Sequence, residues 1–272
     1  MSLLKSKNRF NAIKNLSSVL SALQMVSVVK LQRAKGKAGA IKDYLALPRQ
    51  VLEGRVKPQA LEKKVLLIIT SNRGLCGAFN RQVVNKAIEF SKDYPEMRFE
   101  VFGRKGVELL RLNPFYSGRT ILSEYESIDR IEFKRVRAIL QRILNLKAEV
   151  YVAYNSAQSL MVQVPKIYKL FPVPQEISVD REPLDFILEP NSEELGAELF
   201  RHYLEMRFYQ ILVDSEVGEL SARLMILKGA VDNSKELIDQ LKITVNKERQ
   251  ALITRELIEI VSSVEALRRD YE

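Results

Sequence analysis

The side chains best suited to catalysis are scarce in this sequence. Cys76 is its only cysteine and His202 its only histidine. An internal disulfide is therefore impossible, and a zinc site built from several Cys and His ligands is excluded. One imidazole leaves at most a single group that titrates near neutral pH, and a lone histidine is more often a packing or surface residue. We expect no catalytic residue, no metal site and no cofactor.

The segment SNRGLCGAFN (71–80) is the best candidate for a binding loop. It follows a predicted strand and opens a predicted helix, where free backbone N–H groups can bind an anion. It lacks the GK[ST] ending of a phosphate-binding loop, and Gly74 with Gly77 falls short of a GxGxxG fingerprint. A glycine pair at such a turn usually serves backbone geometry, which favours an exposed contact loop. Nothing nearby in sequence would activate the Cys76 thiol, which we expect to lie exposed on this loop.

Two runs of charge have simple explanations. Glu193, Glu194 and Glu198 stand where a helix is predicted to begin, and carboxylates stabilise a helix at that end. The basic run KLQRAKGKAGAIK (30–42) is the strongest candidate for nucleic-acid binding, but it has no aromatic residue to stack on bases. A solvated helix face, or contact with an acidic protein surface, explains it more simply.

The composition is that of a globular protein with a basic balance. The chain has 272 residues, of which 46% are hydrophobic, and its 43 Lys and Arg against 34 Asp and Glu give a net charge of +9. This surplus predicts a partner richer in acid, which nucleic acid, an anionic membrane or an acidic protein would satisfy. No stretch approaches the roughly 20 apolar residues that cross a bilayer, and the start MSLLKSKNRF lacks the apolar region of a signal peptide. We expect no transmembrane segment, so another subunit must supply any membrane association.

The position of the prolines divides the chain into three parts. All of them lie between Pro48 and Pro190. Because a proline inside a helix costs about 3 kcal/mol, the two proline-free ends can form long helices. The predicted domains are an N-terminal coiled-coil helix (1–55), a globular domain (56–190) and a C-terminal coiled-coil helix (191–272).

In the C-terminal segment, apolar residues recur at alternating spacings of three and four. They are Leu199, Tyr203, Met206, Val213, Val217, Leu220, Leu224, Leu227, Val231, Ile238, Leu241 and Val245, with Gln210 and Ser234 in the gaps. This pattern is the seam of a coiled coil, which a second helix must cover. After Val245 the seam slips by one position and resumes at Ile253, Leu257, Ile260, Val264 and Leu267.

The N-terminal segment offers the partner helix. Its apolar residues also repeat every three or four positions, at Phe10, Ile13, Leu16, Leu20, Leu23 and Val26. We expect this helix to run antiparallel to the C-terminal one. Gly36 and Gly39 weaken it near its end, and Pro48 is predicted to lie beyond it.

The central part alternates short apolar runs with amphipathic stretches. Strands are predicted at 64–70, 99–103 and 149–154, and helices at 79–92, 104–112 and 131–146. This alternation predicts a largely parallel sheet covered by helices on its faces. The proline-containing stretches 163–173 and 183–190 could add edge strands, where proline is tolerated.

Four blocks of the sequence resemble the gamma subunits of F-type ATP synthases, over nearly the whole chain. MVSVVKLQRA (25–34) is similar to the N-terminal helix signature of that family, and SNRGLCGAFN to its Gly-Leu-Cys-Gly loop. QVPKIYKLFP (163–172) is similar to its central Gln-Val-Pro segment. The longest block runs from Glu219 and Arg223 through NKERQALITRELIEIVSSVEAL (246–267).

The resemblance implies an α/β fold in which a long antiparallel coiled coil joins a Rossmann-like domain with a mostly parallel sheet. It implies the non-catalytic rotor of the central stalk, which couples proton-driven rotation of the c-ring to the conformational cycle of the catalytic beta subunits. The implied partners are the alpha and beta ring, the epsilon subunit and the c-ring, with no nucleic acid. The implied location is peripheral, on the cytoplasmic face of a bacterial inner membrane.

The resemblance also implies contact residues. Arg249, Gln250 and Thr254 match positions that make polar contacts with the beta subunit. Arg73, Leu75 and Cys76 fall on a loop that also touches beta, and Lys30 and Arg33 fall where the basic N-terminal helix faces an acidic part of beta. Ile260, Val264 and Leu267 match the tip that turns in the apical bearing. Two alternatives stay open, a coiled-coil scaffold and a basic nucleic-acid-binding protein.

Overall fold

The computed structural model describes residues 3–52, 61–112, 120–121, 132–173 and 192–269. The chain forms two compact units. One comprises residues 27–225, and the other combines residues 1–26 with residues 226–272. The predicted domain boundaries at 55/56 and 190/191 lie outside the described residues.

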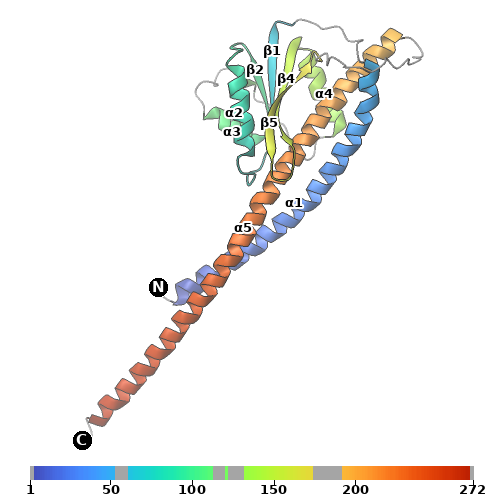
Figure 1. The fold of residues 1–272 in the computed structure, drawn as a ribbon. Coiled ribbons are helices and arrows are strands. Elements are labelled where there is room, and N and C mark those ends of the chain that lie inside the picture. Colours follow the sequence, from blue (N-terminus) through green and yellow to red (C-terminus); the bar gives the residue numbers. More distant parts are fainter. Residues whose placement is uncertain (1–2, 53–60, 113–119, 122–131, 174–191, 270–272) are drawn as a thin grey trace. The chain divides into compact units, whose positions relative to one another are not determined.

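A five-stranded sheet is the centre of the 27–225 unit (Figure 1). Its strands are β1 (Lys63–Ile69), β2 (Arg98–Phe102), β3 (Thr120–Ile121), β4 (Ala148–Ala157) and β5 (Gln163–Phe171). They lie in the order β3-β2-β1-β4-β5, and all neighbours are parallel except β4 and β5. The carboxyl ends of β1, β2 and β4 therefore meet at one edge of the sheet, where loops can gather.

Helices cover both faces of this sheet (Figure 1). Side chains alternate between the faces along each strand, so Leu66 and Ile68 pack under α2 (Phe79–Ser91) and α3 (Arg104–Arg111). Leu67 and Ile69 face the other way, toward α4 (Phe133–Leu144) and the long helix α5 (Ser192–Arg269). The strands are buried on both sides, which explains why they appear in the sequence as continuous apolar runs.

A close backbone contact fixes the edge where β1 and β2 end. Gly103 has a φ of +90°, and a Cβ there would lie 2.2 Å from the carbonyl oxygen of Thr70. The Thr70 hydroxyl donates to the carbonyl of Phe102 (2.6 Å) and accepts from the N–H of Gly106 (2.9 Å). Only glycine suits this turn, which joins β2 to α3 directly beside the end of β1.

Helix α1 (Leu3–Leu52) packs on α5 within the same unit. Leu31 and Ala34 form a cluster with Val217 and Leu220. Farther along α1, Ile41 and Leu45 pack with residues of α5 that come earlier in the sequence, Tyr203 and Val213. Residue numbers that increase along α1 meet residue numbers that decrease along α5, so the predicted antiparallel pairing is confirmed.

The same two helices pair again in the other unit, where polar residues share the seam with apolar ones. The hydroxyl of Ser234 donates to that of Ser17 (2.9 Å). At spacings of three and four, the covered positions of α1 are Leu3, Ser6, Phe10, Ile13, Ser17, Leu20, Gln24 and Ser27. Phe10, Ile13 and Leu20 are therefore on the seam as predicted.

Three of the predicted seam residues of α1 are in fact exposed: Leu16 (49%), Leu23 (42%) and Val26 (54%). The heptad that begins with Leu31 and Ala34 sets the rotation of the helix, and continued backward it reaches serines rather than these apolar side chains. Apolar periodicity alone selected half of the seam positions wrongly, because a seam can include small polar residues.

Most of the predicted strands and helices are confirmed, and β5 forms an edge strand as expected. β3 was not predicted, since two residues carry no periodic signal, and the stretch 183–190 lies outside the described residues. The prediction that α1 ends before Pro48 is wrong, because the helix continues to Leu52. Packing of Ile41 and Leu45 against α5 just before this proline offsets its cost of about 3 kcal/mol.

Helix α1 also departs from the expectation that no segment suits a bilayer. It is the one described helix that is long and apolar enough to cross a membrane, with an 18-residue window of mean hydropathy 1.3. That property rests on length and composition only. It is a weak indication, because the core helices of soluble proteins and N-terminal signal sequences share it.

Candidate partner-binding surfaces

The loop between β1 and α2 is held in shape by its own polar side chains. The N–H of Ser71 donates to Asn80 Oδ1 (2.8 Å), and Asn80 Nδ2 donates back to the Ser71 hydroxyl (2.8 Å). That hydroxyl in turn donates to the carbonyl of Arg73 (2.6 Å). Asn72 Oδ1 accepts from the N–H of Arg104 at the start of α3 (2.8 Å). These bonds satisfy backbone groups that a loop would otherwise leave to water.

Within this loop Leu75 points outward and Cys76 inward. Leu75 and Gly77 have φ values of 62° and 59°, in the left-handed region that bulky side chains rarely adopt. This turn leaves Leu75 55% exposed, while Cys76 is only 3% exposed and packs with Phe79 and Ala222. The predicted contact loop is therefore exposed at Arg73 and Leu75.

The expectation of an exposed thiol is wrong. Asn80 Nδ2 donates to Cys76 Sγ (3.2 Å), and burial raises the pKa of the thiol, although the hydrogen bond with Ser71 acts in the opposite direction. A buried, protonated thiol is a poor nucleophile. Cys76 anchors the loop, and of the three contacts predicted on it only Arg73 and Leu75 are exposed.

Arg223 of α5 holds the outer side of the same loop. Its guanidinium donates to the carbonyl oxygens of Gly74 (3.4 Å) and Arg73 (3.5 Å), and it forms an ion pair with Glu219 one helical turn earlier. Its side chain is only 14% exposed. Sequence reasoning placed Arg223 in a family block but gave it no role, because the carbonyls that it binds are about 150 residues away in the chain.

The basic residues of α1 lie on two of its sides. Lys30 is half-buried, whereas Arg33, Lys35 and Lys37 are exposed. Arg33 is thus the better placed of the two predicted contacts on this helix. It lies next to Ala34, which packs on α5.

The C-terminal part of α5 is uncovered. Glu248 is the last half-buried residue, and every described side chain from 249 to 264 is exposed. Arg249 and Gln250 project freely, while the hydroxyl of Thr254 donates to the carbonyl of Gln250 (3.0 Å). All three lie in the unit that combines 1–26 with 226–272, whereas the loop and the basic residues belong to 27–225.

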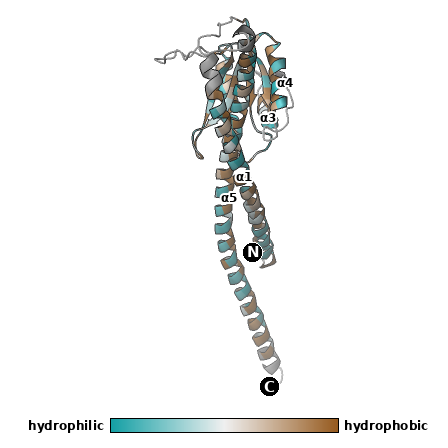
Figure 2. Cartoon of the chain, turned by 90° about the vertical axis from the view of Figure 1, so that its right-hand side faces the viewer, coloured by the Kyte–Doolittle hydropathy of each residue, from teal (hydrophilic) through white to brown (hydrophobic). Residues whose placement is uncertain are grey.

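Apolar residues are prominent on this uncovered stretch, and hydrophobic colouring returns toward the end of α5 in Figure 2. Ile253, Leu257, Ile260 and Val264 are 48–60% exposed, where the sequence predicts that the seam resumes. The side chain of Leu267 lies outside the described residues. No described residue of this chain covers the resumed seam, so it has to meet another molecule or water.

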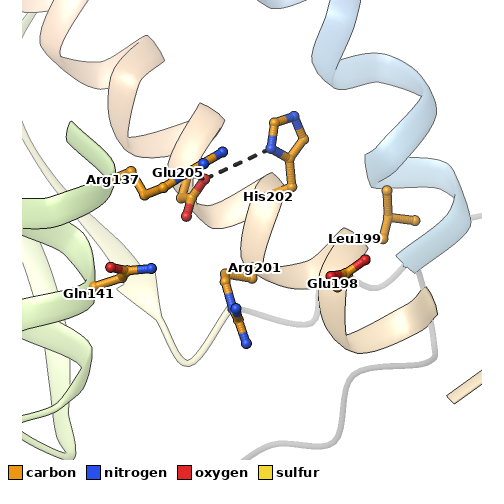
Figure 3. Close-up of a pocket in the computed structure, with 7 residues that line it drawn as sticks. All are labelled: Arg137, Gln141, Glu198, Leu199, Arg201, His202 and Glu205. Carbon is orange, nitrogen blue, oxygen red and sulfur yellow. Dashed lines mark hydrogen bonds and ion pairs between the residues drawn. The ribbon is translucent and has the colours of Figure 1, made fainter. Parts of the chain in front are cut away.

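An open pocket of about 400 Å³ lies between α4 and the beginning of α5 (Figure 3). Glu205, whose side chain is 3% exposed, accepts from Arg137 Nε (2.9 Å) and lies 3.8 Å from His202 Nδ1. His202 Nε2 is 2.9 Å from the hydroxyl of Tyr44 on α1. The only histidine thus links α1 with α5, and Glu205 links α5 with α4.

This pocket offers no catalytic arrangement. The Glu205 carboxylate is held by Arg137 and has the His202 imidazole near it, and none of the lining residues is a Ser, Thr, Cys or Lys nucleophile. Among the described residues no group of three His, Cys, Asp or Glu side chains could hold a metal ion. The pocket therefore ties three helices together, which agrees with a packing role for His202.

These surfaces can be compared with known proteins. A family model described as ATP synthase matches residues 2–267. An ATP synthase gamma chain from Rubrobacter xylanophilus is 32% identical, over 96% of this chain and 97% of the relative. Another from Flavobacterium psychrophilum is also 32% identical, with the same coverage. The chain belongs to the ATP synthase gamma-chain family.

Solved structures share the fold of this gamma-family chain. One is a chain of the Euglena gracilis mitochondrial ATP synthase, from an assembly of OSCP, F1 and c-ring, with a TM-score of 0.72 at 19% identity over 99% of this chain and 96% of that one. Another, from the central stalk and c-ring of Tetrahymena thermophila, has a TM-score of 0.59 at 20% identity and covers 78% and 99%. The predicted fold class is confirmed, while the individual contact residues stay predictions.

Proposed function

We propose that this chain is the non-catalytic central-stalk subunit of an F-type ATP synthase. It couples proton-driven rotation of a membrane-embedded c-ring to the conformational cycle of catalytic beta subunits. Its partners are the alpha and beta ring, the epsilon subunit and the c-ring, and it works at the cytoplasmic face of a bacterial inner membrane. ATP chemistry then belongs to beta, and this chain acts by conformational coupling between distant sites.

One observation carries the proposal. Helix α5 continues beyond Glu248 with every described side chain exposed up to Val264, and apolar residues recur along it. An apolar surface of this extent marks a site of protein contact. In a gamma-family chain the matching occupant is the ring of alpha and beta subunits, which would enclose this part of the helix.

The polar residues of the helix suit a moving contact. Arg249 and Gln250 are exposed just after the last covered residue, Glu248. Exposed polar and ionic contacts are worth about 0–1 kcal/mol each, so they can break and re-form at each step of a rotation. We assign these two residues, with Thr254, to contacts with beta, and Ile260, Val264 and Leu267 to the bearing.

The test is assembly with the alpha and beta subunits from the same source. We expect the purified chain to co-assemble with them and to confer ATP hydrolysis on the complex. Arg249→Ala combined with Gln250→Ala should lower that hydrolysis several-fold without loss of assembly. Circular dichroism of the free variant should match that of the parent chain, because both side chains are exposed.

The matched control is Lys86→Ala with Glu89→Ala, an exposed ion pair on α2 that takes no part in the proposed contacts. It should leave hydrolysis unchanged. A chain that fails to join the ring, or joins it without stimulating hydrolysis, would indicate a scaffold instead. Unchanged turnover in the assembled Arg249/Gln250 variant would refute the assignment of those residues to beta.

A further inference from the structure

Leu75 is presented by a backbone that a leucine does not favour. Its φ of 62° lies in the left-handed region, which is unfavourable for a residue with a Cβ. Packing of Leu75 within the chain adds little stability in return, because its side chain is 55% exposed. A strained turn that displays an apolar side chain needs support from the surrounding structure.

Support comes from α5 on both sides of Leu75. The carbonyls of the two preceding residues, Arg73 and Gly74, accept from the guanidinium of Arg223. The following residue, Cys76, packs against Ala222, the neighbour of Arg223 on the helix. Glu219 pairs with the guanidinium from one turn away, which limits the directions that Arg223 can take.

Arginine is the residue type that suits this task. Its planar guanidinium carries five N–H donors in a fixed fork, so it can serve two carbonyls and a carboxylate together. A lysine at position 223 would have the same charge but could not bind the two carbonyls and the carboxylate in this fixed geometry. The Arg223 side chain is only 14% exposed, which shields its ion pair with Glu219, while its two hydrogen bonds to the carbonyls lie at the exposed side of the loop.

We propose that Arg223 is a positioning residue, which holds the Arg73–Cys76 turn so that Leu75 projects as a preformed apolar anchor for the partner ring. The inference rests on the proposed function and adds to it. A preformed anchor avoids the ordering cost that a loose loop would incur on binding. Arg223 acts through Leu75, so the two side chains should contribute to ring affinity as one unit.

A double-mutant cycle tests this dependence. The affinity of the full-length chain for the alpha and beta ring is measured by titration for Leu75→Ala, Arg223→Ala and the pair. We expect Leu75→Ala to weaken binding about 10-fold, as loss of a buried leucine side chain does. Arg223→Ala should weaken it to a similar degree, and the double variant little further. Arg223→Lys should retain less than half of the wild-type affinity.

Hydrogen exchange of the free chain supplies a readout that separates positioning from direct contact. Arg223→Ala should speed amide exchange within 72–77, whereas Leu75→Ala should not. Arg201→Ala, an exposed arginine on the same helix, serves as the matched control and should change neither exchange nor affinity. Thermal unfolding of each variant shows that the fold persists.

The outcomes separate this inference from the proposed function. A wild-type chain that does not bind the ring overturns both. A wild-type chain that binds, with Leu75→Ala or Arg223→Ala binding equally well, overturns the inference alone. Additive losses in the double variant, or unchanged exchange in Arg223→Ala, also overturn it.

Discussion

At the scale of single residues, the loop 71–80 shows what a sequence can specify and what it cannot. Its place between a strand and a helix follows from residue types, and so does the absence of a phosphate-binding signature. The inward direction of Cys76 does not follow, because it depends on the left-handed turn at Leu75 and on Ala222 of a distant helix. Arg223 was missed for the same reason.

Burial of Cys76 makes the thiol slow to react. Because burial raises its pKa and only 3% of the residue is exposed, we expect maleimide to modify the native chain at least about 100-fold more slowly than the unfolded chain at neutral pH. Mass spectrometry of quenched samples measures both rates. The control is Leu75→Cys in a Cys76→Ser background, which places an exposed thiol one residue away. Equal rates for native and unfolded chain would show that the loop does not enclose Cys76.

Asp214 gives the fold a pH dependence. Burial raises its pKa above the ordinary value of 3.8, although Arg207, Lys166 and Lys42 oppose the shift. A raised carboxyl pKa means that the folded state binds the proton more tightly. The neutral Asp214 carboxyl therefore contributes to the stability of the fold. This contribution is complete below about pH 3.8 and is lost as pH rises through the folded pKa.

The variant Asp214→Asn should therefore be more stable than the parent chain at neutral pH. The difference should shrink as pH falls below the folded pKa, where the parent carboxyl is also neutral. Urea unfolding at a series of pH values measures it. A variant that is less stable at neutral pH would mean that the three cations, rather than burial, dominate at this site.

At the scale of elements, the strands and the pairing of α1 with α5 could be predicted because their apolar periodicity is strong. The prediction was accurate for α5, whose seam is largely apolar, and partly wrong for α1, whose seam includes Ser6, Ser17 and Ser27. The rotation of α1 is set by tertiary packing near Leu31, which no local pattern reveals. Pro48 was misjudged for a similar reason, since packing offset a local penalty.

The seam of α5 can be tested with matched leucines on one helix. Leu220 is 3% exposed and packs with Leu31 and Ala34, whereas Leu237 is 42% exposed. We expect Leu220→Ala to lower the free energy of unfolding by about 2–4 kcal/mol, and Leu237→Ala by no more than about 0.5 kcal/mol. Urea titration followed by circular dichroism compares them. Similar losses in both variants would contradict the assigned seam.

At the scale of the whole molecule, family membership and fold followed from motifs spread over nearly the full chain, and the comparisons confirm both. The contact residues with partner chains cannot be confirmed from the sequence motifs or the fold of this chain. They lie on surfaces whose partners are other chains, so their energetic value appears only in the assembly. This is why the exposed positions Arg249 and Gln250 stay predictions, while Cys76 could be corrected from this chain alone.

The exposed helical segment 249–264 also affects what happens to the chain before assembly. A newly made copy that has not yet met the proposed ring exposes these apolar side chains to solvent, and chaperones and proteases act on such surfaces. In the proposed complex the ring would cover them. We therefore expect surplus copies to be degraded, which would keep the amount of this subunit in step with the number of rings available to receive it.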